Sequence, residues 1–292
     1  MPSWNIHAAI TKKILESNDP ERLGIYDTNA FKFGNLLPDV YVGYMVKDIT
    51  HTLRYIQTHL TEPEHIPIPG ADTFWNTFCD PYIASGGVSS MVLGAWSHLQ
   101  TDAVFNKAVR AFNAAHNIAP GNETRIKKQA DFHLFGNSLD IDIAINPTSH
   151  LLEEAAKFPH YAIDAPDVRA AIAAFKEAKR KSKTEPMTNN YLLLSRDFLN
   201  STLQSATNVV TDHLKEYTHE VASFGWKIGS PLQISAAEKN LEESAAHDRP
   251  ILDIGPAPEI LFKDDRDRAS IEYEIAHMKA HANTHAEGEN SA

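Results

Sequence analysis

The sequence predicts an all-α protein: a multi-helix single domain with a metal cluster in a cleft between helices. Apolar residues recur along extended stretches with the period of a helix that buries one face. No stretch alternates apolar and polar residues as a half-buried strand would, and no internal repeat is visible. Histidine and aspartate residues occur within the helical stretches, and His98 and Asp102 are spaced to share one helix face. These observations together define the predicted fold class.

The first half of the chain predicts a series of helices separated by helix-breaking residues. Asn18-Asp19-Pro20 ends the first helix, and Pro120-Gly121-Asn122 forms a turn before the last one. A loop rich in proline and acidic residues, 61–70, interrupts the series. The predicted segments are 5–17, a short helix within 27–50, 50–60, 71–83, 88–116 and 123–144.

The second half continues the helical pattern without a composition change that would mark a domain boundary. We therefore expect one domain over residues 1–292, in which 146–280 pack as additional helices. The polar segment 281–292 is expected to be a disordered tail. The predicted elements are helices at 149–157, 165–183, 188–224 and 234–246, an irregular stretch at 248–266 and a last helix at 266–280.

Composition narrows the class of protein. Of 292 residues, 42% are hydrophobic and 22% charged, which is ordinary for a globular protein with a sizeable core. The single cysteine, Cys79, excludes an internal disulfide and argues against a thiolate metal site. No apolar run reaches the roughly 20 residues that span a bilayer, and the N-terminus lacks a secretory pattern. We therefore expect a cytoplasmic protein without a transmembrane segment.

The net charge of the chain limits the kinds of molecule that the protein is expected to bind. A formal net charge of -11 disfavours binding to nucleic acid, which depends on Lys and Arg contacts with phosphates. Bound metal ions would reverse the local sign, so the charge leaves a small-molecule or lipid phosphoester open as the substrate. The sequence does not indicate an oligomeric state.

The strongest motif is the pair His98 and Asp102. Residues four apart on a helix can bind one ion together, and imidazole nitrogen with carboxylate oxygen is a ligand mixture of hydrolytic zinc sites. Three earlier segments carry similar residues: His7 opens the first helix, Asp39 follows Pro38, and His51 follows a polar stretch. Each of these residues alone can also be explained as a packing, turn or surface residue. They indicate a metal site because they occur together.

Taken in order, these motifs resemble the zinc-dependent phospholipase C family, which is related to P1-type nucleases. The family pattern is an early His, a Gly-x-x-x-Pro-Asp segment, a lone His and a His-x-x-x-Asp helix. The chain matches it at His7, Gly34 to Asp39, His51, and His98 with Asp102, all within residues 1–145. The resemblance implies an all-helical fold in which ligands from several helices surround one cleft.

The resemblance also implies a ligand set and a chemistry. His51, His98 and Asp102 would hold one zinc ion, with Asp39 beside it as a ligand or catalytic base. His7 would bind a second ion with Asp102 as the bridging carboxylate. Two zinc ions can activate a water and stabilise charge on phosphoryl oxygens.

The third zinc site of the family is altered in this chain. The nearest matching positions are Asn106 and His133 with Asn137, and asparagine is a weak zinc ligand because it is neutral. Asp131 or Asp140 are candidates to replace it, as ligands or by orienting the imidazoles. The expected cofactor is therefore two zinc ions, or three if this site is retained.

The predicted function is hydrolysis of a phosphate ester by a metal-activated water, as in a phospholipase C-like enzyme. Phe74, Trp75 and Phe78 lie at helical spacing and are candidates for a substrate pocket, although such residues are more often core. Three alternatives stay open: a metal-dependent nuclease or phosphomonoesterase relative, a hydrolase of a non-phosphate small molecule, and a non-catalytic metal-stabilised helical protein.

Overall fold

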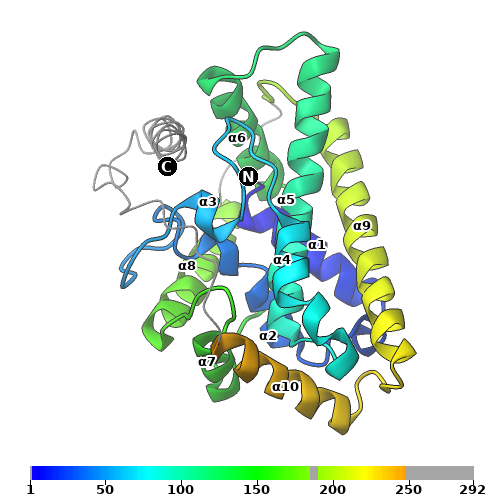
Figure 1. Ribbon diagram of the computed structural model, residues 1–292. Coiled ribbons are helices and arrows are strands. Elements are labelled where there is room, and N and C mark those ends of the chain that lie inside the picture. The colour runs from blue at the N-terminus through cyan, green and yellow to red at the C-terminus, as the bar shows by residue number, and fades with distance from the viewer. Residues whose placement is uncertain (1, 185–189, 247–292) are drawn as a thin grey trace, which may run out of the picture.

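Two long helices, α5 (Ser90–Ala115) and α9 (Arg196–Ser223), run side by side and organise the molecule (Figure 1). The computed structural model describes residues 2–184 and 190–246. Helices α2 and α4 pack on α5, and α1 packs on α9 and α6. The core is formed by apolar side chains from these elements. It encloses the first two thirds of α5, where most residues up to Asn106 are buried.

The described residues confirm the all-α class: they contain ten α-helices and no strand. Within this part of the chain, none of the helices is both long and apolar enough to cross a bilayer. The remaining α-helices are α1 (Trp4–Ser17), α2 (Thr28–Gly34), α3 (Tyr55–Thr58), α4 (Ala71–Phe78), α6 (Asn122–Asn137), α7 (Ser149–Ala156), α8 (Ala165–Thr184) and α10 (Pro231–Ala246). Three 3₁₀ helices cover Pro20–Leu23, Leu37–Asp39 and Asp80–Ser85.

Several helix boundaries differ from those predicted by the sequence. The helix expected over 50–60 is only the single turn α3, and α6 ends at Asn137 rather than near 144. Helix α9 begins at Arg196, not 188, because the backbone N–H groups just before it bind the Asp131 carboxylate instead of continuing a helix. The irregular stretch, the last helix and the tail expected over 248–292 lie outside the described residues.

A close crossing of α2 and α5 sets the position of the residues around it. Gly34 and Gly94 face each other where the helices meet: a Cβ on Gly34 would lie 2.2 Å from the Met91 carbonyl oxygen, and one on Gly94 2.3 Å from the Phe31 carbonyl oxygen. Only glycine permits this approach of two backbones. The chain leaving α2 is therefore held against the middle of α5, next to His98.

Candidate metal centre

Five buried side chains meet beside this crossing, and we call them the central cluster: His7, Asp39, His59, His98 and Asp102. They come from α1, the end of the 3₁₀ helix after α2, the residue following α3, and one face of α5. All five have 0% exposed surface. Segments far apart in the sequence thus place three imidazoles and two carboxylates in one closed space.

The ligand-type atoms of the central cluster lie within metal-sharing distance of one another. His7 Nε2 is 3.1 Å from Asp102 Oδ1, and His59 Nε2 is 3.5 Å from both Asp39 Oδ1 and Asp102 Oδ2. The Nε2 atoms of His59 and His98 are 3.3 Å apart. Two overlapping triplets could each hold an ion: His7 with Asp39 and His98, and His59 with His98 and Asp102.

The surroundings decide which nitrogen of each imidazole faces the centre. His98 Nδ1 lies 2.8 Å from the Asn35 carbonyl oxygen, which can only accept a hydrogen bond, so Nδ1 carries the proton. In His59, Nδ1 lies 2.8 Å from the Thr58 hydroxyl, whose own proton is donated to the Tyr55 carbonyl. Both neutral rings therefore direct the Nε2 lone pair into the cluster, as metal-binding histidines do.

Several polar atoms of the central cluster have no hydrogen-bond partner among the described residues. They are both carboxylate oxygens of Asp39 and Nδ1 of His7, whereas His7 Nε2 and Asp102 Oδ1 have only each other, 3.1 Å apart. Leaving a buried polar atom unsatisfied costs roughly 1–3 kcal/mol. The Trp4 indole lies near Asp39, but its N–H does not reach hydrogen-bond geometry. A divalent cation would satisfy this set of atoms, so the residues fit a metal site.

Burial also prepares the imidazoles as ligands. It lowers the pKa of His59 to about 3 and that of His98 well below its ordinary value, so both are neutral near pH 7. Burial and the neighbouring Asp102 raise the pKa of Asp39. For Asp102, burial acts in the same direction, but His98 and His7 outweigh it and the pKa falls below its usual range. A metal ion would bind without having to displace protons from His59 or His98.

The structure places His59, not His51, in the central cluster. His51 is exposed and stacks on Tyr41 with 4.0 Å between ring centroids, because residues 51–54 precede the helix rather than belonging to it. His59 follows the short helix α3 and stacks on Tyr55 at 3.8 Å. The signal available in the sequence was the apolar Ile56 three positions before His59, whereas the position three before His51 is the charged Asp48.

The residues predicted for a third metal site lie apart from the central cluster. Asn106 is buried and donates to the Pro67 carbonyl at 2.8 Å. Asn137 accepts a hydrogen bond from Asn5 at 3.0 Å and lies 3.1 Å from His133 Nε2. The amides thus have protein partners, and the described residues show no metal-binding triplet at these positions.

The predicted auxiliary residues have structural roles. Asp131 accepts three backbone N–H groups, from Leu192, Leu193 and Leu194 at 2.6–2.8 Å, and so fixes the chain before α9. Asp140 is exposed and forms an ion pair with Lys12.

The aromatic residues considered for a substrate pocket belong to the core. Phe74 and Phe78 are buried and pack on each other with 5.0 Å between ring centroids. Trp75 packs on Trp96 at 4.3 Å. None of the three lines the cavity described next.

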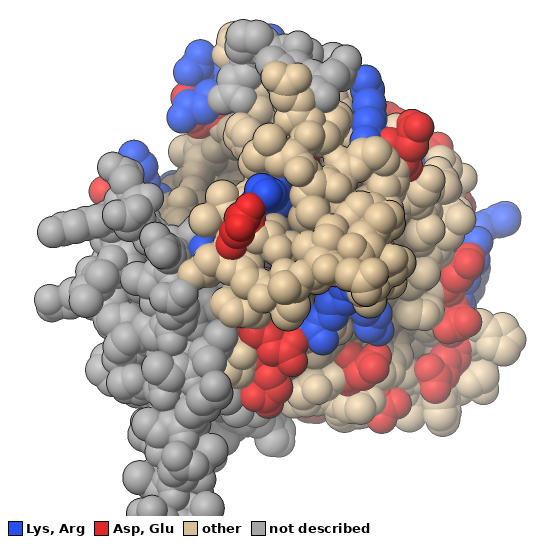
Figure 2. All heavy atoms as spheres, turned by 90° about the horizontal axis from the view of Figure 1, so that it is seen from above, with Lys and Arg blue, Asp and Glu red and all other residues tan. Residues whose placement is uncertain are grey.

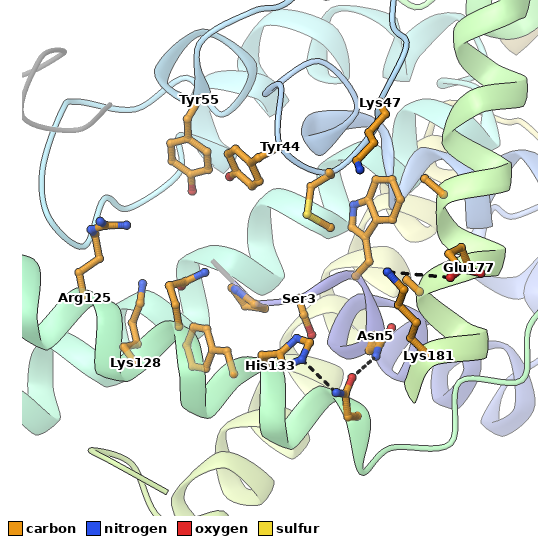
Figure 3. Close-up of a pocket in the computed structure, with 18 of the residues that line it drawn as sticks. Ser3, Asn5, Tyr44, Lys47, Tyr55, Arg125, Lys128, His133, Glu177 and Lys181 are labelled. Carbon is orange, nitrogen blue, oxygen red and sulfur yellow. Dashed lines mark hydrogen bonds and ion pairs between the residues drawn. The ribbon is translucent and has the colours of Figure 1, made fainter. Parts of the chain in front are cut away.

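A cavity of about 820 Å³ meets the central cluster at Tyr55. Figure 3 shows residues that line this cavity. Arg125 and Lys128 project into it from α6, facing Tyr44, Lys47 and Tyr55 from the segment before and within α3. The cavity is large enough for a small organic ligand. The Tyr55 hydroxyl donates to Asp102 Oδ2 at 3.3 Å, so this side chain links the cavity wall to the cluster.

Two cations of the cavity are almost completely buried. Lys128 is 1% and Arg125 4% exposed, and Lys128 Nζ lies 3.5 Å from the Asn106 amide oxygen. On the outer face seen in Figure 2, by contrast, Lys and Arg lie in separate small groups, several of them beside Asp or Glu. The cavity lining thus contains four cations, Lys47, Arg125, Lys128 and Lys181, and two anions, Asp48 and Glu177, in a protein whose net charge is -11.

The fold and site define an all-α protein with a buried histidine and aspartate cluster able to hold metal ions. No family model, curated protein or solved structure matches the chain.

Proposed function

We propose that the protein is a metal-dependent hydrolase of phosphate esters, with two zinc ions held by the central cluster. The observation that carries the proposal is the cluster itself, whose buried oxygens and nitrogens lack partners beside a cavity that contains buried cations. A bound ion pair would supply an activated water and stabilise charge on phosphoryl oxygens. Three of the motifs that resemble phospholipase C, those at His7, Asp39 and His98 with Asp102, support the same proposal.

The chain's own residues have separable roles in this proposal. Asp102 faces His7, His59 and His98 and is the candidate shared ligand. Asp39, whose carboxylate lies 3.5 Å from His59 and 3.9 Å from His98, is the candidate base that accepts a proton from the attacking water. Arg125 and Lys128 would bind the anionic phosphate, since a buried cation interacts strongly with a charged ligand.

The complete burial of the five ligands favours one competing function, a metal centre that only stabilises the fold. The cavity lining contains none of the five ligands and meets the cluster at Tyr55, so a substrate phosphate would reach the cluster only if the Tyr55 ring moved. A structural centre needs no such access, and it would be closed by protein ligands. The two functions differ in what the loss of Asp39 would do.

Replacing Asp39 by asparagine is expected to reduce turnover about 100-fold or more and metal content far less, because Asp102 and the three imidazoles remain as ligands whereas the amide cannot act as a base. Turnover would be measured with a chromogenic phosphodiester on zinc-loaded protein, and zinc by elemental analysis. Asp140→Asn, which alters an exposed ion pair, is the matched control. Equal loss of metal and activity, or no hydrolysis by the native chain, would favour the structural centre.

Replacing Lys128 by methionine is expected to raise KM for the phosphodiester about tenfold, because one charge-assisted hydrogen bond to the phosphate is lost. The zinc content should stay unchanged, because Lys128 is not a proposed ligand. Lys127→Met is the control, since Lys127 is the exposed neighbour on α6. A carboxylic ester tested in parallel separates the substrate classes. If KM does not change for the phosphodiester, or changes equally for both esters, the cavity does not select phosphate.

A further inference from the structure

A second group of metal-ligating side chains lies away from the central cluster, where α7 meets the beginning of α2 (Figure 1). Asp27 immediately precedes α2, and His150 and Glu154 lie one turn apart on α7. One ligand atom of each residue lies within 4.8 Å of those of the other two. We call these three residues the α2–α7 cluster.

Each member of the α2–α7 cluster has one ligand atom left after its structural hydrogen bonds are formed. Asp27 uses Oδ1 to accept from the N–H groups of Asn29 and Ala30 at the start of α2, so Oδ2 faces the cluster. Glu154 uses Oε1 to accept from the Met91 N–H at 3.3 Å. Its second oxygen, Oε2, is buried without a hydrogen-bond partner among the described residues, in a side chain only 5% exposed.

His150 is oriented for the same centre from its other side. Its Nε2 atom lies 3.5 Å from Glu238 on α10, and its Nδ1 atom lies 3.2 Å from Asp27 Oδ2 and 4.0 Å from Glu154 Oε2. A carboxylate that accepts the proton of one ring nitrogen leaves the other nitrogen free to bind a metal. Glu238 would thus be a positioning residue.

A protonated His150 does not account for this arrangement. The single Nδ1 proton can reach Asp27 Oδ2, but 4.0 Å to Glu154 Oε2 is too long for a hydrogen bond. The buried oxygen of Glu154 would stay unsatisfied. In a tetrahedral zinc site, ligand atoms about 2.0–2.1 Å from the ion lie about 3.3 Å apart. The 3.2 Å separation matches this spacing, and the 4.0 Å separation would have to shorten when an ion binds.

We propose that Asp27, His150 and Glu154 form a second metal site, which takes a divalent transition-metal ion such as Zn²⁺ and joins α7 to the start of α2. One nitrogen and two carboxylate oxygens are acceptable zinc ligands, and water would complete the coordination. His150 is half exposed, so the ion can enter from solvent. The site is independent of the central cluster and of any hydrolysis there.

The test counts zinc bound to the full chain after removal of metal with a chelator and dialysis against Zn²⁺. His150→Ala and Glu154→Gln are each expected to bind one zinc fewer than the native chain; glutamine keeps the acceptor for Met91. His219→Ala, an exposed histidine on α9, is the control and should bind the native number. Unchanged stoichiometry in both cluster variants would overturn the proposal.

A second measurement guards against a variant that fails to fold. In the background Asp102→Ala, which disrupts the central cluster, Zn²⁺ is expected to raise the melting temperature, since an ion that binds only the folded state stabilises it. Adding Glu154→Gln should abolish that rise and leave the melting temperature in chelator nearly unchanged. A rise that persists in the double variant would place the ion elsewhere and contradict the site.

Discussion

Asp102→Ala is expected to remove the zinc ions that we propose for the central cluster and to abolish the proposed hydrolysis. The Asp102 carboxylate contacts His7 at 3.1 Å, His59 at 3.5 Å and His98 at 3.8 Å, so its loss withdraws the one anion common to all three imidazoles. Loss of a hydrogen bond that merely supports a ligand weakens metal binding about 10- to 100-fold, and loss of a shared ligand should exceed that. Elemental analysis and phosphodiester hydrolysis measure the two effects.

The control for this variant is Asp212→Ala, an exposed aspartate on α9 that pairs with Lys215. It should retain both metal and activity. Circular dichroism in chelator would show whether the Asp102→Ala chain still folds. If the folded variant binds as much zinc as the native chain at the central cluster, Asp102 is not a ligand and the proposed centre is wrong.

Local sequence spacing was sufficient to find the residues that α5 carries. His98 and Asp102 lie four apart on one helix, and any straight helix through them puts both on one face. Asp39 could be proposed because the Pro-Asp turn ends the short helix before it. The structure brings these three together with His7, although their convergence depends on the Gly34 and Gly94 crossing, which spacing alone does not reveal.

The remaining site residues depend on tertiary structure. Choosing between His51 and His59 required knowing that the helix begins at Tyr55, which a local pattern locates only to within a few residues. Asp131 looked like a ligand, but its oxygens are used by backbone groups some sixty positions later in the sequence. Lys128 is an ordinary polar residue in the sequence, and only the fold buries it in a cavity.

A similar limit applies to the helix ends. The stretch before α9 has helical composition, yet Asp131 binds three successive N–H groups there and Ser195 caps the helix at Phe198. Because a carboxylate satisfies those donors directly, nothing favours their pairing within a helix. The fold class survives such local differences because it depends on the period of apolar residues over whole segments, not on their ends.

The metal-free protein is expected to lose stability as the pH falls, and His59 should account for much of the loss. Burial lowers the pKa of His59 to about 3 in the folded state, whereas an unfolded chain has the ordinary value near 6.5. Between these values the unfolded chain binds the extra proton, so the contribution of His59 is complete above about pH 6.5 and is lost toward pH 3. Its slope is about 1.4 kcal/mol per pH unit.

The measurement is urea unfolding in chelator at pH 6 and pH 4, for the native chain and for His59→Gln. Glutamine does not titrate, so the free energy of unfolding should fall about 2.5 kcal/mol less in the variant across this interval. Asp39 acts oppositely, since its raised pKa makes the folded state retain a proton, but it is present in both chains and cancels in the comparison. Equal slopes would mean that His59 titrates normally, which contradicts its burial among Asp39, His98 and Asp102.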